Sequence, residues 1–132
     1  VETGNNAMIT SCFLGRKLID DLDTKHLKVL WDPANALYCG ENPSKNALDS
    51  MEGGYLGHVH MKDVEVSIHQ AKIKCVALGE GQMAPHLQTI SERLDQIGYD
   101  GSMSLESVYR PTEGNFEDGF NASITKFKNL YS

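Results

Sequence analysis

Four side chains of the kinds that bind divalent metal ions stand at the ends of apolar stretches of the sequence. They are two glutamates, an aspartate and a histidine: Glu2, Asp32, His60 and Glu106. Carboxylates combined with an imidazole suit a divalent cation such as Mn²⁺, Mg²⁺, Co²⁺ or Zn²⁺. Singly, each residue is better explained as a surface carboxylate or a strand-end cap. Because all of them occupy equivalent positions, the set predicts a shared metal site.

Residues 55–63, with the sequence YLGHVHMKD, contain the most informative of these stretches. Because the side chains of a strand alternate between two faces, a strand over residues 56–62 groups a polar set on one face. That face carries Leu56, His58, His60 and Lys62, and the other carries Tyr55, Gly57, Val59 and Met61. The stretch alone leaves open that both histidines are ordinary hydrogen-bonded core or surface residues.

Three further strands end at the other ligand-type residues. Residues 27–32 (LKVLWD) read as a short buried strand, and Pro33 ends it because proline cannot donate to a β-ladder. Residues 102–106 form another strand with alternating apolar and polar side chains. Val1 and Glu2 are expected to be the last residues of one more strand.

Helices are predicted between these strands. Apolar residues recur at helical spacing in three segments, 11–22, 85–97 and 116–130. A further helix is predicted to begin at Asn42-Pro43, a capping side chain followed by proline at the first helical position, and to run to about residue 51 before Gly53. Residues 34–41 are predicted to be a loop, and residues 73–77 a short extra strand within a loop.

The alternation of strands and helices predicts an α/β fold built from parallel βαβ units. Four such units are half of an eight-stranded barrel, in which all strands end at the same face. The ligand-type residues then converge although they lie far apart in the sequence. An open four-stranded sheet is the alternative topology, but it would give Glu2 no complete strand.

Composition limits the classes of protein to which the chain can belong. Its 132 residues are enough for one domain with a core, and 40% hydrophobic and 23% charged residues are typical of a globular protein. The net charge of −6 argues against nucleic acid as a partner. No apolar run reaches membrane-spanning length, so no membrane partner is expected. Three cysteines without a CxxC pattern predict free thiols in a cytoplasmic protein.

The first residue, Val1, predicts that the chain is a piece of a longer protein. A half-barrel on its own would expose two sheet edges and much of its inner face. We therefore expect this half to require an upstream half-barrel, or a second copy in a homo-oligomer, for stability.

Several motifs together resemble the xylose-isomerase-like TIM-barrel superfamily, which holds sugar isomerases and epimerases and the AP endonuclease family 2 enzymes of the endonuclease IV type. These motifs are Asp32-Pro33-Ala34-Asn35, HVHMKD at 58–63, LGEG at 78–81, and GYDG at 98–101 leading to Leu105-Glu106. The resemblance covers nearly the whole chain. It implies that residues 1–132 are the C-terminal half of a single (β/α)8 TIM-barrel domain, with strands five to eight and their helices.

The resemblance also implies a metal site and a reaction. The metal of that family is held by Glu, Asp, His and Glu on these four strands, which correspond to Glu2, Asp32, His60 and Glu106. The implied activity is a metal-dependent isomerase or epimerase of a small sugar or sugar phosphate. Its reaction proceeds through an enediolate that the metal stabilises. Glu2 and Glu106 would then be both ligands and the catalytic acid/base pair.

Three neighbouring residues complete the predicted site. Asn35 stands where some epimerases of the family carry histidine, and its amide would bind a substrate hydroxyl. His58 is expected one step deeper on the strand than the ligand His60, either beside the ligands or in the core. Asp63 would either orient His60 or cap the following loop.

Other functions of the same fold stay open. Inosose dehydratase and hydroxypyruvate isomerase types use such a site for related enol chemistry. An endonuclease IV type hydrolase of abasic DNA needs further His and Asp ligands, but the sequence there reads Ile73-Lys74-Cys75. A non-catalytic barrel that binds a metabolite is disfavoured, because clustered carboxylates repel one another without a cation.

Overall fold

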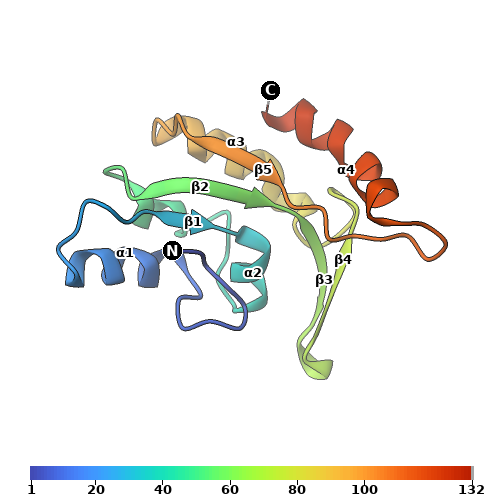
Figure 1. Cartoon of the computed structure of the whole chain (residues 1–132), viewed down its shortest axis with the longest axis horizontal. Helices are drawn as coiled ribbons and strands as arrows, with labels where there is room; N and C mark the ends of the chain where they lie inside the picture. Colours follow the sequence, from blue (N-terminus) through green and yellow to red (C-terminus); the bar gives the residue numbers. More distant parts are fainter. Residues whose placement is uncertain (132) are drawn as a thin grey trace.

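A parallel β-sheet of three strands forms the centre of the chain in a computed structural model that describes residues 1–131 (Figure 1). The strand order is β1-β2-β5, with β1 at Val29–Trp31, β2 at Leu56–Met61 and β5 at Ser102–Leu105. Glu2 extends the sheet through an isolated parallel bridge to Leu30. The predicted α/β fold with parallel strands is therefore confirmed.

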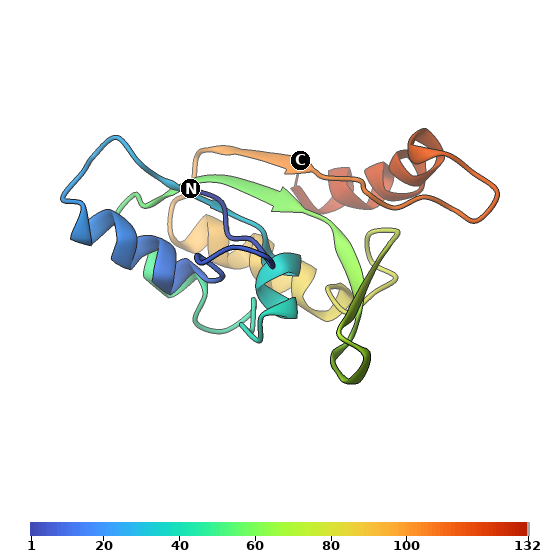
Figure 2. The ribbon, with the colours of Figure 1, turned by 60° about the horizontal axis from the view of Figure 1, so that its bottom comes forward.

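Helices cover one face of this sheet. The described residues form α1 (Cys12–Asp21), α2 (Pro33–Tyr38), α3 (Leu87–Gln96) and α4 (Phe116–Tyr131). Figure 2 shows α1 and α3 against one face of the sheet and the opposite face bare. Helices α1, α3 and α4 confirm the predictions for 11–22, 85–97 and 116–130. None of the helices within residues 1–131 has the length and apolar character needed to cross a bilayer.

The core lies between the sheet and these helices. The sheet contributes fully buried side chains at alternating positions, Val29, Trp31, Val59 and Met61. The helices contribute Ile19 from α1 and Leu87, Ile90 and Leu94 from α3. Full burial of one such side chain stabilises the fold by about 1.5–3 kcal/mol. The bare face is left for the polar residues of the same strands.

A β-bulge interrupts the alternation at the start of β2. Val29 and Leu30 are consecutive, but their partners Leu56 and His58 are separated by Gly57. Leu56 is therefore buried in the core, which corrects the prediction that it shares a face with His58. A Cβ on Gly57 would lie only 2.7 Å from the Cβ of Lys28, so glycine suits the extra position.

A short helix, α2, follows β1 directly. Residues 34–41 were expected to be a loop, and this expectation is wrong for residues up to Tyr38. Asp32 is the N-cap, and Pro33 occupies the first helical position, where a missing N–H costs no hydrogen bond. The strand end and the helix start thus share one residue.

The predicted helix from Asn42 to about residue 51 is also wrong. The Asn42 side chain accepts a hydrogen bond from the Ser44 backbone N–H at 3.0 Å and closes a local turn. Such a bond competes with the helical hydrogen-bond pattern. Only a 3₁₀ turn, η1 (Leu48–Met51), forms here. Its residues Leu48 and Met51 are buried.

An antiparallel hairpin extends from the end of β2 (Figure 1). It consists of β3 (Asp63–Ser67) and β4 (Lys72–Val76), joined through the 3₁₀ turn η2 (Ile68–Gln70). A further 3₁₀ turn, η3 (Ala84–His86), leads into α3. The short strand predicted at 73–77 corresponds to β4, whereas its partner β3 was not predicted.

Candidate metal centre

Three of the predicted ligands converge beside the carboxyl ends of the strands. Ligand atoms of Glu2, Asp32 and His60 all lie within 4.8 Å of one another. Glu106 adjoins this group, because its Oε2 is 3.7 Å from His60 Nδ1. His60 Nδ1 is also 3.4 Å from Glu2 Oε1. Parallel strand direction thus brings together residues that are up to 104 positions apart (from 2 to 106).

Asp32 is fixed in place by hydrogen bonds to both carboxylate oxygens. Its Oδ1 accepts from the backbone N–H groups of Ala34 and Asn35, each at 3.0 Å. Its Oδ2 accepts from Asn35 Nδ2 at 2.9 Å and from Lys62 Nζ at 2.6 Å. The side chain is fully buried. Burial raises the pKa of Asp32, and the charge and hydrogen bond of Lys62 act against that rise.

The Asn35 side chain links the N-terminal segment at Thr3 to Asp32, the residue that follows β1. Its Nδ2 donates to Asp32 Oδ2 and, at 3.2 Å, to the backbone carbonyl of Thr3. Thr3 Oγ1 in turn accepts from the Asp32 backbone N–H at 2.9 Å. The Asn35 amide therefore positions Asp32 and the residue after Glu2. The contact with substrate predicted for Asn35 stays a prediction.

Lys62 is a site residue that the sequence reasoning did not assign. Its Nζ lies 2.6 Å from Asp32 Oδ2 and 2.6 Å from Glu106 Oε2, and its side chain is 11% exposed. Burial lowers the pKa of Lys62, but the charges and hydrogen bonds of Asp32 and Glu106 prevail and raise it. The available signal was its place two residues after His60 on the same face of β2.

Glu106 follows β5 and continues the sheet ladder, because its backbone N–H donates to the Met61 carbonyl at 2.9 Å. Burial acts to raise the pKa of Glu106, but the hydrogen bond and charge of Lys62 outweigh it and lower the pKa. Glu106 is therefore a carboxylate at neutral pH. Its side chain is one-third exposed, at 33%, so solutes can reach it.

The donor set fits a divalent cation. His60 Nδ1 is buried and, among the described residues, has no hydrogen-bond partner. A buried polar atom without a partner is costly, and most such atoms in native proteins have one. Here the nitrogen is close to two carboxylates, so a cation bound by all three groups would satisfy it. Imidazole and carboxylate ligands suit Mn²⁺, Co²⁺ or Zn²⁺, and the carboxylates alone suit Mg²⁺.

His58 lies one layer deeper than His60 and is engaged by serines. Its Nδ1 is 2.9 Å from Ser102 Oγ and its Nε2 is 2.8 Å from Ser104 Oγ. The rings of His58 and His60 meet edge to face, with their centroids 5.2 Å apart. His58 therefore supports the orientation of His60, and both of its ring nitrogens already have partners.

Asp63 caps the loop after the hairpin. Its Oδ1 accepts from the backbone N–H groups of Val64 and Met83, both at 2.8 Å. Its Oδ2 accepts from those of Gly79 at 2.8 Å and Gly81 at 3.0 Å. Of the two roles considered for Asp63, the structure shows the loop cap. All of these bonds hold the loop beside the end of β2.

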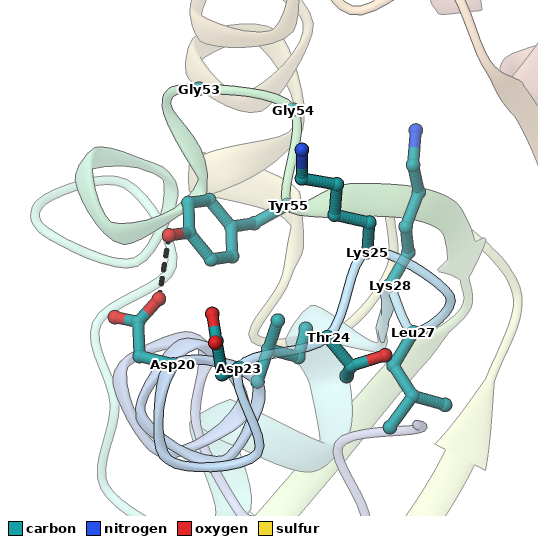
Figure 3. A pocket seen from close by; sticks show the side chains of 10 residues that line it. Asp20, Asp23, Thr24, Lys25, Leu27, Lys28, Gly53, Gly54 and Tyr55 are labelled. Carbon is teal, nitrogen blue, oxygen red and sulfur yellow. Dashed lines mark hydrogen bonds between the residues drawn. The ribbon is translucent and has the colours of Figure 1, made fainter.

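A separate hollow lies at the opposite end of the sheet, at the amino ends of the strands. It has a volume of about 480 Å³, and its lining includes Asp20, Asp23, Lys25, Lys28 and Tyr55. Figure 3 shows these charged side chains spread around the hollow, with one hydrogen bond from Tyr55 to Asp20. Because parallel barrels carry their sites at the carboxyl ends of the strands, the ligand cluster is the candidate site and this hollow is not.

Solved structures of similar fold include three barrel proteins. The xylose isomerase domain protein from Planctomyces limnophilus is 23% identical with a TM-score of 0.72, over 98% of this chain and 43% of that one. The 3-keto-D-glucoside 4-epimerase from E. coli is 21% identical with a TM-score of 0.72, over 97% of this chain and 44% of that one. The D-psicose 3-epimerase from Clostridium cellulolyticum H10 is 22% identical with a TM-score of 0.64, over 92% of this chain and 38% of that one.

The chain thus spans less than half the length of each of these three proteins, and it forms only part of a barrel. No protein with a curated function matches it. Residues 2–129 match the family described as xylose isomerase-like TIM barrel. Since this match spans nearly the whole chain, the protein belongs to the xylose isomerase-like TIM barrel family.

Proposed function

We propose that the protein is a divalent-metal-dependent isomerase or epimerase of a small sugar or sugar derivative. The observation that carries the proposal is the convergence of Glu2, Asp32 and His60 within 4.8 Å, with Glu106 beside them. Two proteins of similar fold, named 3-keto-D-glucoside 4-epimerase and D-psicose 3-epimerase, support the same class of substrate.

In this proposal Glu2, Asp32, His60 and Glu106 hold the cation. A bound divalent cation supplies electrophilic assistance to a carbonyl group of the sugar. The protein residues supply the proton transfer. Glu2 and Glu106 approach the substrate from different strands, so one carboxylate takes a proton from carbon and the other returns one.

The two glutamates differ in their surroundings. Glu106 Oε2 accepts a hydrogen bond from Lys62 at 2.6 Å, which stabilises its carboxylate form. Glu2 is 48% exposed, and its closest ionic neighbour is His60. Asp32 has donors on both oxygens and serves as a fixed anchor. Proton transfer therefore belongs to the glutamates and not to Asp32.

We further propose that this chain is the C-terminal half of the barrel and works together with an upstream half. The bare inner face of the sheet supports this (Figure 2). So does the β-strand order, in which β5 has β2 as a partner on one side and is an edge of the sheet on the other. An edge strand of this kind is a ready site for pairing with a further strand.

The test is the metal content of the protein with its whole barrel, measured by elemental analysis. We expect about one equivalent of divalent metal, because the ligands form one cluster. The double variant His60→Ala, Glu106→Ala is expected to lose it. The matched control His26→Ala, Glu92→Ala changes one exposed histidine and one exposed glutamate that are not part of the ligand cluster, and should retain the metal.

The outcomes separate the candidate functions. Metal that is lost only in the site variant, followed by exchange of a ketose C–H proton with solvent, supports the isomerase. Dehydration of the sugar without such isomerisation would favour the inosose dehydratase type. Two or three equivalents of zinc would favour the endonuclease IV type. No metal in the unaltered protein, even after reloading, contradicts the proposal.

A further inference from the structure

Lys62 occupies an unusual place for a lysine. It follows the end of the central strand β2, and its Nζ is 2.6 Å from one carboxylate on each neighbouring strand end, Asp32 after β1 and Glu106 after β5. Its side chain is only 11% exposed. Lysine is seldom buried unless it is paired, so the ammonium is held here by these two carboxylates.

The charges of the cluster explain why a cation is needed. Glu2, Asp32 and Glu106 bring three carboxylates to one small region. Like charges at this range raise one another's free energy unless a cation lies among them. A lysine ammonium is a compact point charge with three donors, and in this respect it resembles a metal ion more than a planar guanidinium does.

The position of Lys62 also explains why Glu106 lies outside the group formed by the other three predicted ligands. Glu106 is absent from the group whose atoms lie within 4.8 Å of one another, which contains only Glu2, Asp32 and His60. The Glu106 Oε2 atom is instead bound to Lys62. The same ammonium holds Asp32 Oδ2, the oxygen that does not cap α2.

We propose that Lys62 is a built-in competitor of the divalent cation for Asp32 and Glu106. It keeps the two carboxylates together when no metal is bound, and it lowers the affinity of the site for metal. Lys62 is thus a positioning residue, and this inference rests on the proposed metal-dependent function. The site becomes one that exchanges its metal, in contrast to a permanently loaded structural site.

The test is the substitution Lys62→Met, which keeps an unbranched side chain one atom shorter than that of lysine and removes its charge. In the protein with its whole barrel, stripped by a chelator, calorimetric titration with Mn²⁺ is expected to show roughly tenfold or tighter binding, because one repelling positive charge is gone. The melting temperature of the stripped variant is expected to fall below that of the unaltered protein, and Mn²⁺ is expected to reverse that order.

Two controls isolate the charge. Lys62→Arg keeps the charge and is expected to leave Mn²⁺ affinity within about threefold of the unaltered protein, since the Coulomb repulsion persists. Lys74→Met removes a lysine of the hairpin whose side chain is 72% exposed and pairs only loosely with Glu65 at 3.4 Å. It is expected to change neither Mn²⁺ affinity nor the effect of Mn²⁺ on melting.

A measurement on the unaltered protein covers the case in which Lys62→Met does not fold. The ¹⁵N signal of the Lys62 ammonium, assigned by its loss in Lys62→Arg, is expected to shift or broaden when diamagnetic Mg²⁺ is added to the stripped protein. An unchanged signal at saturating Mg²⁺ overturns the inference.

The failures of the two proposals are distinguishable. Mn²⁺ binding in the unaltered protein with equal or weaker binding in Lys62→Met overturns the competition by Lys62 and leaves the metal site standing. Absence of Mn²⁺ binding in the unaltered protein overturns the proposed function itself, and the inference with it.

Discussion

The two ends of the parallel strands treat charge in opposite ways. At the carboxyl ends, Asp32 is fully buried and Lys62 is 11% exposed, and each is bound by several partners. At the amino ends, the charged side chains Asp23, Lys25 and Lys28 are exposed around a hollow of about 480 Å³ (Figure 3).

This difference shows why the size of a hollow is a poor guide to function here. Burying a charge costs free energy unless partners compensate for it, so a fold keeps a buried charged cluster only where something is gained. Clusters of this kind are frequent at functional sites. The hollow at the amino ends carries exposed charges that cost nothing to keep and hold no such cluster among the described residues.

The largest effect is expected from Asp32→Ala at the carboxyl ends. The variant leaves Lys62 with one partner fewer and removes the N-cap of α2, so the free energy of unfolding should fall by about 3–5 kcal/mol. Denaturant titration of the whole-barrel protein measures it. Asp32→Asn keeps a cap oxygen and should lose less. A loss below about 1 kcal/mol for the alanine variant would mean that Asp32 contributes no more to stability than the exposed carboxylates at the amino ends of the strands.

A smaller loss, about 2–3 kcal/mol, is expected from Asp63→Asn, because an amide nitrogen would face backbone donors that a carboxylate oxygen now accepts. Hydrogen exchange gives a local measurement. The N–H groups of Gly79 and Gly81 should lose protection, since both donate to Asp63 Oδ2. Protection equal to that of the unaltered protein would mean that the loop does not depend on this cap.

Ser104→Ala tests the layer beneath the ligands. It removes the hydroxyl partner of His58 Nε2, and a loss of about 1 kcal/mol in unfolding free energy is expected. Ser102→Ala should cost less, because Ser102 is exposed and water can replace its hydroxyl. Equal losses measured by denaturant titration would show that His58 is not held as the distances indicate.

The smallest effect is expected at the amino ends. Lys25→Ala removes an exposed lysine from the rim of the hollow, and surface changes of this kind stay within about 0.5 kcal/mol. The Mn²⁺ affinity is expected to stay the same as well. Thermal melting measures the stability, and Mn²⁺ titration measures the affinity. A marked weakening of Mn²⁺ binding would contradict the assignment of chemistry to the carboxyl ends alone.

The convergence at the site was predictable from strand direction. Alternation along β2 placed His60 on the polar face, and parallel order brought Glu2 and Asp32 beside it. The family match confirms the resemblance and the partial barrel. The role of Lys62 was not predictable, because a long side chain at a strand end turns inward only if neighbouring strands offer it carboxylates. Those neighbours depend on the register of three strands.

Local signals were less reliable where two of them looked alike. Asp32-Pro33 and Asn42-Pro43 both combine a capping residue with proline, and only the former begins an α-helix. Asp32 is buried and its Oδ1 accepts two backbone bonds, whereas Asn42 accepts one and closes a turn. The sequence shows the cap but not its surroundings, which decide whether a helix follows.

The extra residue at Gly57 reverses which positions of β2 face the helices, so the alternation of side chains differs before and after the bulge. Before the bulge, the alternation places Leu56 in the core. After the bulge, it places His58, His60 and Lys62 on the face of the sheet that carries the candidate site. Removing Gly57 would change the face on which Leu56 lies and leave the three site-facing residues in place, whereas removing Val59 would turn both His60 and Lys62 toward the helices. The bulge thus separates the part of the strand that builds the core from the part that builds the site.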